Sequence, residues 1–234
     1  MTQTTQATQA TMIDSNPALS SSHASASSLV DWAIAQRKAL LAGILAILVV
    51  AGAFSAYQSS KASAAKKAAA ALFEAKKLGT ESEAGLVALE KVSKDFVGSH
   101  AAWEALMLLG DHHSKKAPQA DLSASWYEKA DQAATDPRQK LLSRYNLAYA
   151  RELQGKWDLA LAAIESGERL GLPIFKSELA LTRGRLLERM GKTPEARQAY
   201  EAVAKDFADS EAARTADQWK ALLPAQNSPE GKTQ

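Results

Sequence analysis

Gly155-Lys-Trp-Asp-Leu-Ala-Leu-Ala-Ala-Ile164 and Gly191-Lys-Thr-Pro-Glu-Ala-Arg-Gln-Ala-Tyr200 are two stretches of this chain that share one pattern. Each has Gly-Lys, three residues, Ala, three further residues and then a bulky apolar side chain, and the two begin 36 residues apart. A recurrence at this period is typical of helical hairpins that stack into a solenoid. Such solenoids usually bind other proteins, so the pattern favours binding over catalysis.

A second recurrence extends the pattern along the chain. Glu90-Lys-Val-Ser-Lys-Asp-Phe-Val-Gly-Ser-His-Ala-Ala102 matches Glu201-Ala-Val-Ala-Lys-Asp-Phe-Ala-Asp-Ser-Glu-Ala-Ala213, and the offset of 111 residues is three times 37. The two recurrences together predict four hairpin units, at about 61–99, 100–136, 137–172 and 173–209, followed by a closing helix at 210–222.

Composition agrees with an all-α fold. The chain has 234 residues, is 46% hydrophobic and rich in alanine, and has only 6% aromatic residues, which favours helix. A net charge of +2 and the lack of a basic stripe with aromatic residues argue against nucleic acid as a partner. The absence of cysteine excludes disulfides and thiolate metal sites but assigns no compartment.

Residues 29–60 are predicted to form an amphipathic lead-in and a single transmembrane helix. The 22 residues from Ala39 to Ser60 carry no charge, and about 20 helical residues cross the hydrocarbon core of a bilayer. Trp32 and Tyr57 lie where interfacial aromatic residues are expected. A cleaved signal peptide is the alternative, because Ala51-Gly52-Ala53 offers a cleavage site, but the 38 residues before the uncharged run are too many for a usual leader. We therefore expect an uncleaved anchor.

Charge does not decide which side of the membrane holds the repeats. Two basic residues precede the span and five lysines follow it closely, which would leave the C-terminal part in the cytoplasm. Long domains, however, are translocated largely regardless of their charge. The polar residues 1–28 are predicted to be a disordered tail, and 224–234 a flexible one.

Capping residues predict where helices begin and end. Thr80 and Glu83 have capping-box spacing at the start of a helix that runs to about Phe96. Asp136-Pro137 and Thr193-Pro194 are predicted as N-cap and first-turn proline pairs. Helices are predicted to stop at Gly155, Gly171 and Gly191.

The repeated positions are similar to the tetratricopeptide repeat, over about 150 residues within 61–223. The third unit fits with Leu147, Ala148, Gly155, Ala160 and Ile164. The fourth fits with Gly184, Gly191, Ala196 and Tyr200, although Arg183 stands where leucine is usual. The second fits with Leu109, Gly110, Tyr127 and Ala130 if one residue is inserted, and the first only in its second helix.

One N-terminal span, a lysine- and alanine-rich helix and a small divergent repeat domain together resemble the YfgM-like family. The segment Leu29-Val-Asp-Trp-Ala-Ile-Ala-Gln-Arg-Lys-Ala-Leu-Leu-Ala-Gly43 resembles the family's lead-in to its span, whereas the 28-residue tail is longer than expected. The resemblance implies a bacterial inner-membrane protein with a periplasmic domain. It also implies an ancillary role at the SecYEG translocon, alongside a membrane-anchored chaperone of the prolyl-isomerase type and envelope clients.

Two other functions fit the same sequence features. One is a tetratricopeptide adaptor for another envelope assembly, such as outer-membrane or cell-division machinery. The other is a soluble exported protein released by cleavage after Ala53. The sequence does not specify the oligomeric state.

We predict no enzymatic activity, cofactor or metal. His112 and His113 point about 100° apart on a helix and are expected at a solvated helix end. Asp95 and Asp206 occupy equivalent helix-end positions of two repeats rather than forming a pair. The sequence has no nucleophile arrangement, phosphate loop or dinucleotide fingerprint.

A protein-binding groove is predicted on the first helix of each hairpin, which lines the concave face of tetratricopeptide folds. Its predicted residues are Met107, Asp111, Leu142, Tyr145, Tyr149, Glu152, Leu181, Arg185 and Arg189. Tyr145 and Tyr149 share one helical face and would form a partly apolar shelf; packing between helices is the alternative. Arg185, Glu188 and Arg189 are expected on a solvated face, and the inter-helix core is expected to hold Trp103, Trp126 and Trp157.

Overall fold

The computed structural model describes residues 31, 32, 34–115 and 117–224, and every regular element in these ranges is a helix, as predicted. The predicted tail 1–28 lies outside the described residues, as does the predicted C-terminal tail apart from Pro224. The chain divides into two compact units, Met1–Lys61 and Ala62–Gln234.

The first unit contains the apolar part of α2, a helix that runs from Arg37 to Lys77. Among the described residues, α2 is the helix that is long and apolar enough to cross a membrane, judged by length and composition. Its large side chains are exposed, from 54% at Ile44 to 68% at Val50. Exposing this much contiguous apolar surface to water is unfavourable, whereas a hydrocarbon environment matches it.

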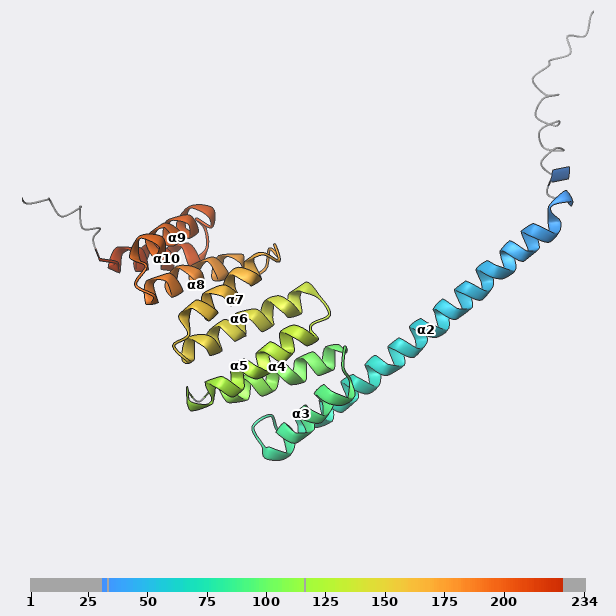
Figure 1. The fold of residues 1–234 in the computed structure, drawn as a ribbon, viewed down its shortest axis with the longest axis horizontal. Helices are drawn as coiled ribbons and strands as arrows, with labels where there is room; N and C mark the ends of the chain where they lie inside the picture. The colour runs from blue at the N-terminus through green and yellow to red at the C-terminus, as the bar shows by residue number, and fades with distance from the viewer. Residues whose placement is uncertain (1–30, 33, 116, 225–234) are drawn as a thin grey trace, which may run out of the picture. The chain divides into compact units, whose positions relative to one another are not determined.

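The second unit contains four helical hairpins and a closing helix, which follow one another along the chain (Figure 1). The hairpins pair the end of α2 with α3 (Glu83–Asp95), α4 (His100–Ser114) with α5 (Ala120–Ala133), α6 (Pro137–Leu153) with α7 (Trp157–Glu168), and α8 (Lys176–Arg189) with α9 (Thr193–Asp206). The closing helix is α10 (Glu211–Leu222). A short 3₁₀ helix, η1 (Ala117–Gln119), lies between α4 and α5, in the hairpin where the sequence needs an inserted residue.

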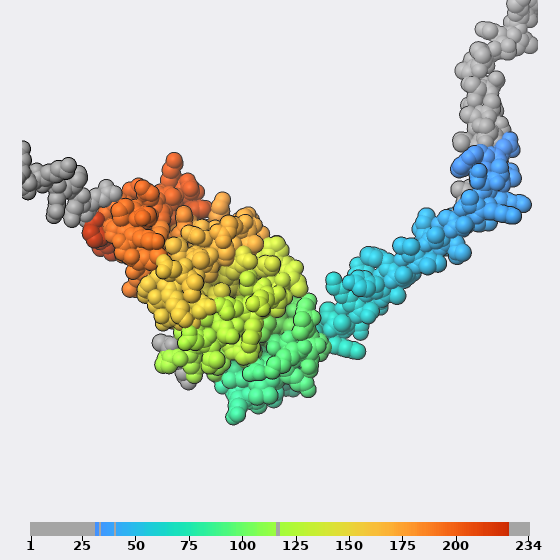
Figure 2. Space-filling view, in the orientation of Figure 1, coloured from blue at the N-terminus to red at the C-terminus, as the bar shows by residue number. Residues whose placement is uncertain are grey.

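The core of this unit is a row of four clusters, each shared by neighbouring helices. This division is expected of a solenoid, in which each hairpin contacts only its neighbours. Leu89, Tyr127, Ile164 and Tyr200 occupy one repeated position on the four second helices, and none is more than 2% exposed. In the space-filling view, side chains fill the spaces between successive hairpins (Figure 2).

The Asp-Phe-x-x-Ser recurrence forms the connection from one hairpin to the next. The helices α3 and α9 end at Asp95 and Asp206, as predicted. The following Ser99 is the N-cap of α4, where its Oγ accepts a 3.1 Å hydrogen bond from the amide of Ala102. Ser210 caps α10 in the same way, at 3.0 Å from the amide of Ala213. The motif therefore recurs because it caps the incoming helix.

The Gly-Lys recurrence forms the turn inside a hairpin. Gly155 and Gly191 have φ values of 69° and 73°, in the left-handed region that glycine adopts without strain. The amide of Lys156 then donates to the carbonyl of Arg151 at 2.9 Å, and that of Lys192 to the carbonyl of Leu187 at 3.0 Å. This six-to-one bond is the Schellman pattern of a helix C-terminus. The predicted stops at Gly155 and Gly191 are confirmed.

Two predicted N-caps are wrong. The N-cap of α3 is Ser82 rather than Thr80, and its Oγ accepts a 3.0 Å bond from the amide of Gly85. The N-cap of α9 is Lys192, which makes no side-chain cap, and Thr193 is already helical. In the second case the tight glycine turn sets the start of the helix, so no capping side chain is required. The Asp136 cap is confirmed, since its Oδ1 accepts from the amides of Arg138 and Gln139 at 2.8 and 3.0 Å.

Two glycines of first helices lie directly against tyrosine rings of second helices. A Cβ added to Gly110 would lie 2.5 Å from Cε1 of Tyr127, and one added to Gly184 would lie 2.6 Å from Cε1 of Tyr200. In the third hairpin, Ala148 and Ile164 occupy the same two positions. Glycine on the first helix thus accompanies a tyrosine ring on the second helix, whereas alanine accompanies the smaller isoleucine side chain.

The three tryptophans of the predicted core differ in burial. Trp103 is buried, and its Nε1 donates a 2.9 Å hydrogen bond to Oγ of Ser143. Trp126 and Trp157 are half-buried and pack against the edges of core clusters.

Candidate protein-binding surface

Three exposed aromatic side chains form a shelf on the first helices of the third and fourth hairpins. Tyr145 and Tyr149 lie on α6 and are 37% and 51% exposed. Phe175, at the N-cap of α8, is 48% exposed and stacks on Tyr145 with ring centroids 6.4 Å apart. We call Tyr145, Tyr149 and Phe175 the aromatic shelf.

The backbone of Phe175 is strained. Its φ of 56° makes it the one residue other than glycine with a positive φ among those described. The left-handed conformation costs a bulky residue about 1–2 kcal/mol. Such strain collects at functional sites, where it holds a side chain in a useful position. The sequence prediction missed Phe175, because no local signal indicates this conformation for phenylalanine.

A bidentate ion pair joins α6 to α8 beside the shelf. Both terminal nitrogens of Arg185 donate to Glu152, one of them at 2.8 Å to Oε2. The hydrogen bond to Glu152 raises the pKa of the Arg185 guanidinium above its ordinary value. Glu188 is also engaged, since it accepts from the Tyr200 hydroxyl at 2.8 Å. Arg185 is half-buried in this pair rather than free on a solvated face, whereas Glu188 is exposed, as predicted.

The surface continues onto the closing helix. Arg185, Glu188 and Arg189 of α8 and Trp219 and Leu222 of α10 line a depression of about 490 Å³. Arg189 is exposed, with its guanidinium 5.9 Å from the Trp157 ring centroid. Leu222 is 80% exposed, and its place in this depression is not evident from the sequence.

The remaining predicted groove residues belong to the packing between helices. Met107 is buried and accepts a hydrogen bond from Oγ of Ser143 at 3.6 Å, so its placement on an exposed groove is wrong. Asp111 accepts from the Tyr127 hydroxyl at 2.6 Å. Leu142 and Leu181 pack against core clusters and are half-buried. The register of the tetratricopeptide repeat assigns each residue to a face of a helix, but it does not specify how far its side chain is buried. The nine predicted groove residues therefore divide between core and surface.

Two tyrosine hydroxyls give the domain a pH-dependent stability. Burial, and then the hydrogen bonds to Asp111 and Glu188, raise the pKa values of Tyr127 and Tyr200 above the ordinary 10. Below pH 10 both hydroxyls are protonated in the folded and the unfolded chain, so this contribution to stability is complete. Above pH 10 the unfolded chain loses these protons first, so stability falls as pH rises.

We therefore expect the urea midpoint to be lower at pH 11 than at pH 8. Lysines also titrate in this range, so the control is the double variant Tyr127→Phe/Tyr200→Phe. This variant should lose most of the difference between the two pH values. An equal difference in the variant and the parent chain would show that the two hydroxyls are not its cause.

The two adjacent histidines at the end of α4 contact residues that precede α3 and α5. Nδ1 of His112 lies 3.0 Å from Oε2 of Glu81, and Nδ1 of His113 lies 3.0 Å from Oε1 of Gln119. Both residues lie in the last turn of α4, as predicted, but they are half-buried rather than fully solvated. Among the described residues, no three or more His, Cys, Asp or Glu side chains are grouped so that they could hold a metal ion.

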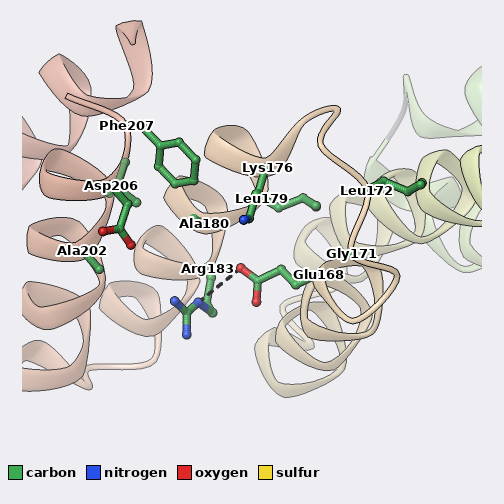
Figure 3. Close-up of a pocket in the computed structure, with 11 residues that line it drawn as sticks. Glu168, Gly171, Leu172, Lys176, Leu179, Ala180, Arg183, Ala202, Asp206 and Phe207 are labelled. Carbon is green, nitrogen blue, oxygen red and sulfur yellow. Dashed lines mark ion pairs between the residues drawn. The ribbon is translucent and has the colours of Figure 1, made fainter. Parts of the chain in front are cut away.

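A pocket of about 190 Å³ lies where α7 meets the fourth hairpin (Figure 3). Arg183, which stands where leucine is usual, has its Nε 3.4 Å from Oε1 of Glu168. That nitrogen is buried and makes no well-aligned hydrogen bond. Burial raises the pKa of Glu168 above its ordinary value. Asp206 and Phe207 of the Asp-Phe motif form the opposite wall.

Residues 31–221 match the family model described as a tetratricopeptide repeat-like domain. The chain belongs to this family. Tetratricopeptide repeat-like domains generally act as protein-interaction modules without enzymatic activity. The match includes the apolar part of α2 as well as the hairpins. None of the curated proteins compared with the chain matches it.

Proposed function

We propose that this tetratricopeptide repeat-like protein is anchored in a bacterial inner membrane by one uncleaved span and binds other proteins in the periplasm. Its role would be that of an ancillary subunit of the translocon and chaperone network in envelope protein export and quality control. One observation carries the proposal: a single chain joins a helix apolar enough to cross a membrane to a repeat domain with an exposed aromatic shelf.

The residue types on the candidate surface support protein binding. Tyrosine, tryptophan and arginine are the residues enriched at energetic hot spots of interfaces. The aromatic shelf and the depression beside Trp219 present these three types on α6, α8 and α10. Aromatic rings provide large contact areas with few rotatable bonds, so little conformational entropy is lost on binding.

Site-specific photo-crosslinking in intact cells tests the partner. A crosslinking residue at Tyr149 of the full-length chain is expected to capture translocon subunits or a membrane-anchored periplasmic chaperone. The control is the same residue at Leu122 on α5, which is 52% exposed and does not contribute to the shelf. Adducts only with other envelope complexes would contradict the translocon assignment, and equal capture from Leu122 would contradict the surface.

Replacing the strained Phe175 separates binding from stability. Phe175→Gly removes backbone strain of about 1–2 kcal/mol and a stacking contact of about 0.5–1.5 kcal/mol, so the two effects oppose each other and stability should change by no more than about 1.5 kcal/mol. Capture from Tyr149 should nevertheless fall several-fold, because the shelf loses one ring. Urea unfolding and adduct yield measure the two effects. Undiminished capture would remove Phe175 from the binding surface.

A further inference from the structure

The first hairpin has an open furrow to which α4 contributes no lining residue. It is lined by α2 and α3 alone and has a volume of about 370 Å³. Ala71, Leu78 and Ala88 form its apolar walls over the buried floor residues Ala75 and Val92. We call this furrow the outer groove.

The fourth hairpin shows what covers the equivalent surface. Val92, Asp95 and Phe96 of the outer groove correspond, by the offset of 111 residues, to Val203, Asp206 and Phe207 of the pocket in Figure 3. There, Glu168, Gly171 and Leu172, at the C-terminal end of α7 and just beyond it, form a third wall. This face of a hairpin is therefore shaped to receive the second helix of a preceding hairpin.

We propose that the outer groove is occupied by an α-helix of another membrane protein, packed as α7 packs on the fourth hairpin. This inference rests on the membrane anchoring proposed above. A second copy of the chain does not provide a suitable helix. Its second helices α3, α5, α7 and α9 already pack on α4, α6, α8 and α10 of the same chain.

Charge defines the chemistry of the helix that fits. Gly79 and Gly191 occupy the same position, just after the first helix of the first and fourth hairpins. Counting eight residues back from each glycine, Ala71 in the first hairpin corresponds to Arg183 in the fourth. The outer groove thus lacks the arginine that pairs with Glu168 in the fourth hairpin. Its rim has Asp95, Lys91 and Glu74, and Glu74 already lies 3.9 Å from the ammonium group of Lys77. The partner helix should therefore present small and aliphatic side chains along one face, with a lysine or arginine directed at Asp95.

Chain length limits where the partner lies. Ala71 of the groove lies only eleven positions along the chain from Ser60, the end of the uncharged run. Even a fully extended chain spans at most about 3.6 Å per residue, so the groove lies within about 40 Å of the span's end in any arrangement. A helix at the membrane surface meets this limit.

Crosslinking from the groove, combined with charge variants, tests the proposal. A photo-crosslinking residue at Leu78 or Lys91 of the full-length, membrane-integrated chain should give an adduct that maps to a surface helix of another membrane protein. Ala88→Glu, in the groove wall, should reduce the adduct at least ten-fold. The matched control Val87→Glu, one position away and outside the groove lining, should not. Asp95→Lys should give the same loss as Ala88→Glu without altering a buried position.

Several outcomes would overturn the inference. These are an adduct of twice the chain mass, adducts with lipid only, or a yield unchanged by Ala88→Glu and Asp95→Lys. Absence of any adduct from Leu78 and Lys91 would also overturn it. If Tyr149 still captures its partner in that experiment, only the outer groove inference fails. If Tyr149 captures nothing, the proposed function fails with it.

Discussion

Replacing Gly184 with alanine should lower the free energy of unfolding of the repeat domain by about 1–3 kcal/mol, as is typical of overpacking. This loss is expected although alanine favours helix over glycine by about 1 kcal/mol. The new Cβ would lie 2.6 Å from Cε1 and 2.7 Å from Cδ1 of Tyr200, whose ring is fully buried. Because the ring is buried, the ring or the two helices must shift to accommodate the added methyl group. Urea unfolding followed by circular dichroism measures the change.

The third hairpin provides the rescue variant. Ala148 and Ile164 stand there in place of Gly184 and Tyr200. The double variant Gly184→Ala/Tyr200→Ile recreates that pair and should be more stable than additivity of the single changes predicts. The single change Tyr200→Ile should destabilise the domain, because it leaves a cavity and an unpaired Glu188. If the stability change of the double variant equals the sum of the two single changes, contact with the tyrosine ring is not the reason for glycine at position 184.

Two arginines in the middle of the uncharged run should abolish membrane anchoring. Each arginine at the centre of a span costs about 2.5–3.5 kcal/mol on insertion scales, so Leu45→Arg/Val49→Arg costs about twice that. Both positions are exposed on α2, at 63%, and make no packing that the change would disrupt. Membrane fractionation should show the chain moving from the pellet, after alkaline extraction, to the soluble fraction.

The control for this experiment is Leu45→Ile/Val49→Ile, which keeps the apolar surface and should remain in the pellet. If the arginine variant also stays in the pellet after extraction, the repeat domain itself binds the membrane or a membrane protein. That result would contradict an anchor formed by α2 alone.

The repeat architecture is predictable because its signals are local and periodic. Gly191 requires a left-handed turn and Tyr200 requires a small facing residue, and both recur at the hairpin period. The predicted cap at Thr80 is wrong because Ser82 nearby has the same capping chemistry. The predicted cap at Thr193 is wrong because the turn at Gly191 starts the helix without a side-chain cap. The geometry of the turn decides both helix starts: Ser82 becomes the N-cap of α3, and α9 begins without a side-chain cap.

The candidate surface is less predictable than the fold. Tyr145 and Tyr149 follow from their four-residue spacing, but Met107 belongs to the core because it faces Ser143 on the next hairpin. Phe175 and Leu222 join the surface through tertiary packing between α6, α8 and α10. Contacts of this kind depend on the crossing of helices, which a single sequence does not encode in any local pattern.

Accessibility labelling in whole cells tests the central claim most directly. The chain has no cysteine, so one introduced cysteine reports one position. Asp209→Cys is exposed in the connection after α9, and Gln36→Cys is exposed just before α2. A membrane-impermeant maleimide should label Asp209→Cys in intact cells and Gln36→Cys only after the inner membrane is permeabilised. Labelling of Asp209→Cys only after permeabilisation, or its recovery in a shortened soluble chain, would contradict an anchored periplasmic repeat domain.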